Sequence, residues 1–177
     1  MSPVRLEDEI RAAFAGVELG GGISLRQAQV IDRYGEGVSD REFEALPKGE
    51  MTNDWSKVPF DELERDCVAH LDAEGLRYYI PALMLSVLNH YDAGSMRVIG
   101  TISALDSRDA YNQRRFALFS EPQRRAVASF LSALPNVVDL WVEHAKVASR
   151  SLQAYWRQYL SESQLPPNKS LERTREG

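Results

Sequence analysis

The sequence is poor in the residues that build covalent cross-links and metal sites. Its 177 residues include 1 cysteine, Cys67, and 3 histidines. A single cysteine excludes a disulfide within the chain, and it excludes zinc or iron–sulfur sites that need several thiolates. We therefore expect no metal and no cofactor, and a fold that is held together by its hydrophobic core.

Long apolar runs are missing as well. No stretch approaches the roughly 18 consecutive apolar residues of a membrane-spanning helix. The first nine residues, MSPVRLEDE, are acidic and lack the apolar core of a signal peptide. These absences predict a cytoplasmic protein that does not associate with membranes.

Signatures of common enzymes do not occur either. The chain has no Gly-x-Ser-x-Gly elbow, no phosphate-binding loop ending in Gly-Lys-Ser/Thr, and no His-Glu-x-x-His. Cys67 and His70 are spaced as neighbours on one helix, and a thiolate–imidazole pair can act as a nucleophile. A small buried cysteine is the commoner outcome, so the sequence favours a protein without catalytic activity.

Charge is unevenly distributed along the chain, whose formal net charge is −5. Residues 37–74 hold 11 acidic and 4 basic residues, whereas residues 106–160 hold 5 acidic and 8 basic ones. The acidic segment is either a solvated face or a surface that attracts a basic partner. A net-acidic chain is poorly suited to nucleic acid, whose affinity comes mainly from neutralised phosphates.

Apolar residues recur at helical spacing through most of the chain, and no strand pattern stands out. We expect an all-α fold, a single domain over residues 4–160 with a disordered tail at 161–177 that lacks aromatic residues. About seven helices are predicted, over residues 4–17, 25–34, 59–71, 81–91, 95–105, 120–135 and 136–160. A further short helix is expected between Ser39 and Pro47, and residues 106–115 are expected to form a loop.

Local signals mark several of these helices. Ser24 with Gln27, Ser39 with Glu42, and Ser120 with Gln123 have the spacing of capping boxes. Residues 78–88 are the most apolar run, and a helix that is apolar on all sides is buried on all sides. Because proline suits the first turn of a helix, we expect the buried central helix to span 81–91, starting at Pro81.

An apolar stripe with 3-4 spacing runs through the last expected helix, from Val138 to Tyr159. Packing against the other helices of a bundle explains such a stripe. The alternative is a homodimer through residues 138–159, which exposure of Trp156 and Tyr159 would favour.

Several blocks together resemble a known family. They are GGISLRQAQVID at 21–32, Asp54-Trp55, EGLRYYIPA at 74–82, and residues 118–131 with QRRAV inside them. The arrangement is similar to an uncharacterised family of small bacterial proteins, a domain of unknown function, over residues 5–135. The resemblance implies a bacterial domain and supplies no catalytic residues.

Two candidate sites follow from charged and aromatic residues. Asp32 and Arg77 lie beside core segments, where they either pair with each other or, with Trp55 and Tyr78, line a ligand pocket. Arginines at 108, 114, 115, 124 and 125 form the one basic cluster, which either binds an acidic partner or pairs internally with the acidic segment 37–74. Listed in full, the candidate residues are Asp32, Trp55, Arg77 and Tyr78 for a ligand, and Arg114, Arg115, Arg124 and Arg125 for a partner.

The absence of catalytic motifs and the segregation of charge along the chain favour a non-catalytic protein-interaction module of the immunity or adaptor type, with another protein as its partner. The alternative is a small-ligand-binding protein or an enzyme with a pocket near Asp32, Trp55, Arg77 and Tyr78.

Overall fold

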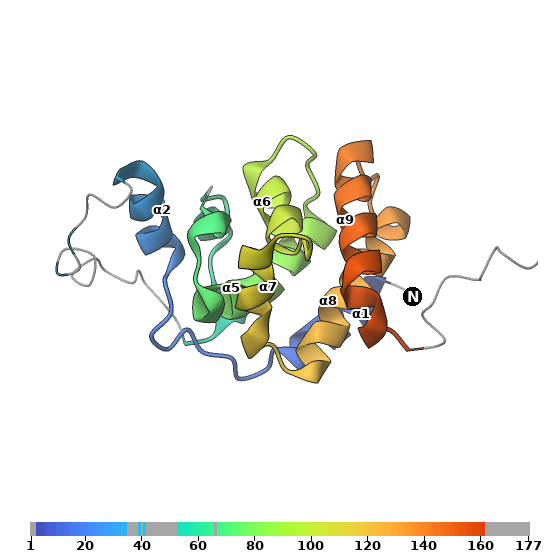
Figure 1. Ribbon diagram of the computed structural model, residues 1–177, viewed down its shortest axis with the longest axis horizontal. Helices are drawn as coiled ribbons and strands as arrows, with labels where there is room; N and C mark the ends of the chain where they lie inside the picture. The colour runs from blue at the N-terminus through green and yellow to red at the C-terminus, as the bar shows by residue number, and fades with distance from the viewer. Residues whose placement is uncertain (1–2, 35–38, 40, 42–52, 66, 162–177) are drawn as a thin grey trace, which may run out of the picture.

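The computed structural model describes residues 3–34, 39, 41, 53–65 and 67–161, and this part of the chain is helical with no β-strand. The expected all-α class is confirmed. Eight α-helices are described, together with four short 3-10 helices (Figure 1). The α-helices are α1 (Pro3–Ala13), α2 (Leu25–Tyr34), α4 (Phe60–Leu63), α5 (Ala73–Asn89), α6 (Met96–Ala104), α7 (Ala110–Arg115), α8 (Glu121–Val137) and α9 (Val142–Ala154). The 3-10 helices are η2 (Trp55–Lys57), η3 (Val68–His70), η4 (Phe116–Leu118) and η5 (Trp156–Tyr159).

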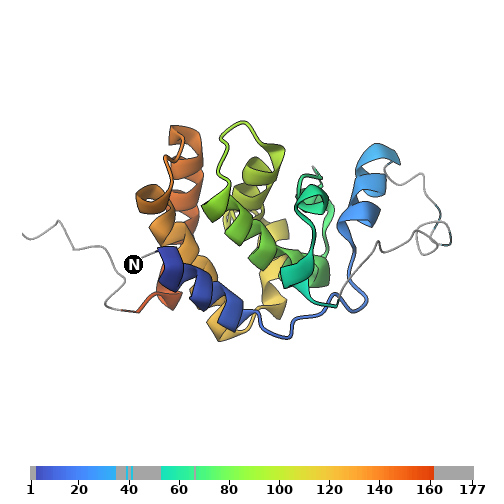
Figure 2. The same ribbon diagram turned by 180° about the vertical axis from the view of Figure 1, so that it is seen from behind.

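The helices form two rough layers. In Figures 1 and 2, α2, α6 and α9 follow one another along the long axis of the molecule, with η3 between α2 and α6, while α1, α5 and α8 lie across their lower ends. Helix α5 carries the centre of the core, because 12 of its 17 residues are buried. The prediction of a central helix buried on all sides is therefore confirmed, although its bounds are not 81–91.

The central helix begins eight residues earlier than predicted, at Ala73. Asp72 caps it: its Oδ1 accepts a hydrogen bond from the Gly75 N–H at 2.8 Å. Pro81 consequently lies in the helix interior, where it removes one backbone hydrogen bond. The prediction that Pro81 starts the helix was therefore wrong. Burial of the surrounding turns offsets the lost hydrogen bond.

The same carboxylate also joins α5 to the loop before α2. Asp72 Oδ1 accepts a second hydrogen bond, from the Ile23 N–H at 3.0 Å. The two segments approach so closely that a Cβ atom on Gly75 would lie 2.4 Å from the Ile23 carbonyl oxygen. Glycine is therefore required at position 75 by the close approach of two backbones.

Two other expected segments have different bounds. The helix predicted over 59–71 is interrupted: α4 ends at Leu63, and η3 is a separate turn that follows Cys67. The loop predicted over 106–115 contains α7, which Asp109 caps by accepting from the Tyr111 N–H at 2.8 Å. In both places a local side-chain or backbone cap decided the boundary, which apolar spacing does not reveal.

The long helix predicted over 136–160 is also wrong. Helix α8 continues to Val137, the backbone is extended at Val138, and α9 begins at Val142. β-branched Val137 and Val138 weaken the helix there. The Tyr91 hydroxyl then accepts a hydrogen bond from the Trp141 N–H at 2.9 Å, which the break leaves without a helical partner.

Several other helix signals are confirmed. Leu6 and Ile10 of α1, and Phe14 directly after it, are fully buried, as their spacing predicts. The capping boxes at Ser24–Gln27 and Ser120–Gln123 both form. The box at Ser39 includes Asp40 and Glu42, which lie outside the described residues, as does the tail beyond Ser161.

Replacing Gly75 with alanine tests the junction between α5 and the loop before α2. The added methyl group would overlap the Ile23 carbonyl oxygen, so we expect a loss of about 1–3 kcal/mol in the free energy of unfolding. Urea denaturation followed by circular dichroism measures it. Gly94→Ala is the control, because its nearest atom, Asp92 Oδ1, would lie 3.6 Å away. Equal stabilities of the two variants would contradict the proposed close contact.

Candidate functional site

Many charged side chains of the acidic segment are used inside the fold. Glu62 forms ion pairs with Arg26 at 2.5 Å and with Arg65 at 2.9 Å. The hydrogen bond from Arg26 is the largest cause that lowers the pKa of Glu62, which falls to about 2. These two arginines link α2, α4 and the residues after α4, so this triad holds helices together and does not present free charge.

A buried arginine supports an exposed phenylalanine. Arg97 is 2% exposed; its Nε donates to Glu64 at 2.6 Å and its Nη2 donates to the His90 carbonyl at 2.9 Å. The guanidinium carbon lies 4.9 Å from the centre of the Phe60 ring. Phe60 also meets the His90 ring edge-on, with 5.2 Å between the ring centres. Although Phe60 is 46% exposed, two neighbours therefore fix its ring.

An exposed tryptophan is held in a comparable way at the start of α9. Trp141 is 53% exposed, and its ring meets that of His144 edge-on at 5.4 Å. The Tyr91 hydroxyl lies 3.0 Å from His144 Nδ1 and accepts from the Trp141 N–H. Burial lowers the pKa of His144. A neutral ring accepts the tyrosyl proton at Nδ1, which satisfies all three groups.

The two supported aromatics belong to one continuous network. His90 contacts Phe60, and the next residue, Tyr91, contacts Trp141 and His144. Met96, which precedes Arg97 in the sequence, and Val142, which follows Trp141, are exposed apolar residues, at 46% and 61%. We call this set the aromatic surface; its members are Phe60, His90, Tyr91, Met96, Trp141 and Val142.

The structure gives three of the predicted ligand residues separate surroundings. Asp32 lies on α2 and pairs with His70 Nε2 at 3.1 Å on an exposed face. Arg77 Nε donates to Gln123 Oε1 at the start of α8, at 3.2 Å. Tyr78 is fully buried against Tyr79. The predicted Asp32–Arg77 ion pair is not formed, and these contacts do not bring the three side chains together.

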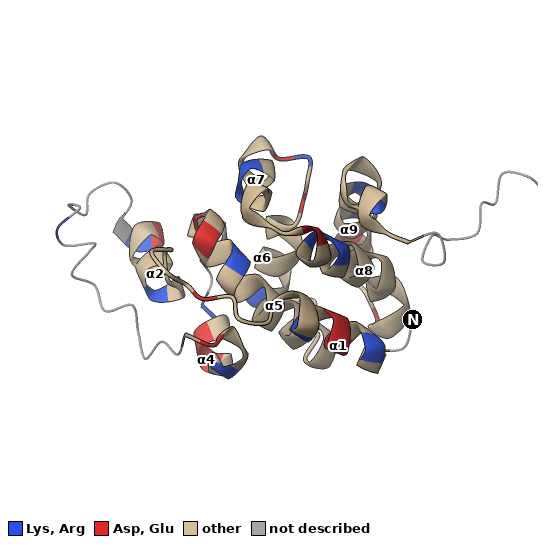
Figure 3. Cartoon of the chain, turned by 90° about the horizontal axis from the view of Figure 1, so that it is seen from below, with Lys and Arg blue, Asp and Glu red and all other residues tan. Residues whose placement is uncertain are grey.

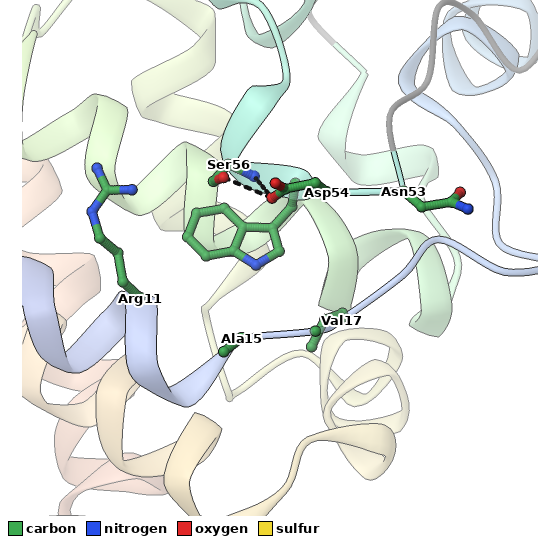
Figure 4. A pocket seen from close by; sticks show the side chains of 8 residues that line it. Arg11, Ala15, Val17, Asn53, Asp54 and Ser56 are labelled. Atoms are coloured by element: carbon green, nitrogen blue, oxygen red, sulfur yellow. Dashed lines mark hydrogen bonds between the residues drawn. The ribbon is translucent and has the colours of Figure 1, made fainter.

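The fourth predicted residue, Trp55, does line a pocket. Its Nε1 donates to the Phe14 carbonyl at 2.7 Å, which anchors its loop to the segment after α1. The pocket measures about 420 Å³ and lies between the end of α1 and η2. Arg11 enters from the α1 side, while Asp54 accepts from Ser56 on the other side (Figure 4). None of the other three predicted residues lines it, and ligand binding there stays a prediction.

Blue segments on α7 and α8 mark the lysine and arginine positions of these helices (Figure 3). The predicted basic cluster there divides into buried and exposed members. Arg115 is 4% exposed, and its Nη1 donates to the carbonyls of Val68 and Leu71. Arg124 donates to the Phe116 carbonyl and to the Tyr159 hydroxyl. Arg125 pairs with Glu121, and Arg114 is exposed. The guanidinium of Arg115 therefore acts within the fold, and the interpretation of internal pairing fits these contacts best.

Cys67 and His70 do not form a nucleophilic pair. Cys67 precedes η3, is 2% exposed, and its Sγ lies 3.1 Å from the Leu25 carbonyl oxygen. His70 instead pairs with Asp32 at the surface. The commoner outcome, a small buried cysteine, is what the structure has.

The described residues contain neither a metal-ion cluster nor a membrane-spanning helix. Among residues 3–34, 53–65 and 67–161, no three or more His, Cys, Asp or Glu side chains are placed to hold a metal ion. Within the same part of the chain, no helix is long and apolar enough to span a bilayer.

Comparison with known proteins places the chain in a family. It belongs to a family of unknown function, DUF6714, whose model matches residues 4–160. The resemblance to an uncharacterised family is confirmed to that extent. Searches of curated proteins and of solved structures return no match.

Sequence reasoning did not identify the aromatic surface. The apolar stripe predicted from Val138 to Tyr159 includes Trp141, and no pattern in the sequence marks Phe60 as exposed. The helix break after Val137 turns Trp141 outward, and a contact over 37 residues, between Phe60 and Arg97, supports the phenylalanine. Neither feature has a local signal in the sequence.

We expect protonation of Glu62 to lower the free energy of unfolding in acid. Its pKa falls from an ordinary 4.5 to about 2 in the fold, so its ion pairs contribute fully above pH 4.5, and this contribution is lost as pH falls toward 2. Glu62→Gln should flatten the fall in unfolding free energy between about pH 5 and 2. Asp61→Asn, which removes a carboxylate without a described ion pair, is the control. A similar acid dependence in wild type and Glu62→Gln would contradict this role.

Neighbouring arginines allow a matched test of the basic cluster. Arg115→Ala removes the buried guanidinium that donates to the carbonyls of Val68 and Leu71, and we expect a loss of about 2–4 kcal/mol in unfolding free energy. Arg114→Ala, at an exposed position, should change it by less than about 0.5 kcal/mol. Thermal and urea unfolding measure both. Comparable small effects would show that Arg115 is as free as its neighbour.

Proposed function

We propose that this protein is a non-catalytic protein-interaction module of the bacterial cytoplasm, of the immunity or adaptor type. The observation that carries the proposal is the aromatic surface. Two large aromatic side chains remain about half exposed although each ring has specific contacts: Phe60 with Arg97 and His90, and Trp141 with the ring of His144. The Tyr91 hydroxyl holds the Trp141 backbone by accepting from its main-chain N–H.

Such fixed, exposed aromatics are suited to binding a protein. Tryptophan and other large aromatics are prominent among the residues that dominate interface energies. A side chain that is already ordered loses less conformational entropy when a partner covers it. The supporting contacts of Phe60 and Trp141 therefore lower the cost of binding, which a side chain exposed by chance would not do.

The remaining polar chemistry supports a non-catalytic role. Glu62, Glu64 and Asp72 accept hydrogen bonds that connect helices or loops. Arg97 and Arg115 are buried donors to backbone carbonyls. Cys67 is buried against the Leu25 carbonyl. These polar groups thus have structural tasks.

A peptide-display selection on the immobilised full chain tests this function. We expect wild type to enrich a family of peptide sequences, and the double variant Phe60→Ala/Trp141→Ala to bind the enriched peptides at least about thirty-fold more weakly, since central aromatic residues each contribute about 2 kcal/mol or more. Binding is measured by titration calorimetry with the synthetic peptides. Circular dichroism confirms that the variant is folded, and Phe60→Leu/Trp141→Leu replaces it if it is not.

The matched control is Val4→Ala/Leu118→Ala, which removes two exposed apolar side chains from outside the aromatic surface. It should bind the peptides like wild type. Failure to enrich any peptide, or equal losses in the control and the aromatic variant, would contradict the proposed function.

A further inference from the structure

The aromatic surface carries a charge pattern that indicates what it binds. Its side chains come from three segments, residues 60–64, 90–97 and 139–146. Each of these segments holds one exposed carboxylate that forms no ion pair with a described residue: Asp61, Asp92 and Asp139. The unpaired negative charges therefore lie in the same three segments that present the aromatic side chains.

Positive charge in these segments is already neutralised. Arg97 pairs with Glu64 at 2.6 Å, and Lys146 pairs with Glu143 at 2.7 Å. No other lysine or arginine occurs in the three segments. Among the charged residues of these segments, the unpaired ones are thus all negative.

Resting on the proposed function, we infer that the aromatic surface binds a basic segment of a partner protein, in which apolar side chains alternate with lysine or arginine. The apolar side chains cover Phe60, Met96, Trp141 and Val142. The basic side chains reach Asp61, Asp92 and Asp139 around them.

The aromatic rings favour the same partner. A guanidinium or ammonium group is attracted to the face of an aromatic ring, most strongly to tryptophan. Phe60 already shows this geometry, because Arg97 lies over its ring within the fold. The half-exposed Trp141 ring offers a partner's cation an equivalent place, and an acidic or neutral segment would gain neither interaction. Opposite charge also steers the partner during encounter.

The peptides enriched on the wild-type chain test this inference directly. We expect them to carry a net positive charge, and we expect their affinity to fall as ionic strength rises from about 50 to 200 mM, because exposed charge pairs are screened by salt. The triple variant Asp61→Asn/Asp92→Asn/Asp139→Asn should weaken binding about tenfold or more at low salt. Asparagine at position 92 retains the acceptor for the Gly94 N–H, so the turn is preserved.

The control variant is Glu7→Gln/Asp8→Asn/Glu18→Gln, which removes the same amount of charge from α1 and the loop after it. It should bind like wild type and keep the salt dependence. Enriched peptides without excess positive charge, or equal binding by the two triple variants, would overturn the inference. In that case loss of binding in Phe60→Ala/Trp141→Ala would still support the proposed function.

A second copy of the chain is the competing occupant. Trp141 lies in the segment 138–159, for which the sequence left a homodimer open. Sedimentation velocity of wild type and Phe60→Ala/Trp141→Ala distinguishes the two. We expect both to sediment as monomers at about 100 µM, whereas a dimer that the double variant abolishes would overturn the inference of a basic partner.

Discussion

The carboxylate of Asp72 is the interaction on which the rest of the described structure depends. One oxygen caps α5 through the Gly75 N–H and holds the loop before α2 through the Ile23 N–H. Arg115 binds the carbonyls of Val68 and Leu71 immediately before it. These contacts fix the start of the buried central helix. The residues after its other end are His90, whose ring contacts Phe60, and Tyr91, whose hydroxyl accepts from the Trp141 main-chain N–H.

Charge in this protein has two distinct roles. Where cations and carboxylates meet inside the fold, as at Arg97 and Glu64, they position helices or an aromatic ring. Where carboxylates remain exposed, as at Asp61, Asp92 and Asp139, they share segments with the aromatic surface. The formal charge of −5 does not separate these roles. Arg97 belongs to the first role, because it pairs with Glu64 and lies over the exposed Phe60 ring.

Much of the fold follows from local patterns, because apolar spacing and capping boxes report contacts within a few residues. Those patterns predicted the stripe of α1 and the cap at Ser120, but not the start of α5 or the break after Val137. The last two depend on Asp72 reaching Ile23 and on Tyr91 reaching Trp141, contacts between residues about fifty apart. The residues of the candidate site could not be predicted for the same reason. Whether a given aromatic side chain is exposed depends on how all the helices pack together.

The central claim is that the exposed rings are ordered before any partner arrives. Nitrogen-15 relaxation of the three tryptophan indole N–H groups in the free protein tests it most directly, with Trp55 and Trp156 as buried references. We predict that the order parameter of the Trp141 indole N–H is close to those of Trp55 and Trp156, at about 0.85. A value below about 0.6 would show a freely moving side chain and would contradict a preformed interaction surface.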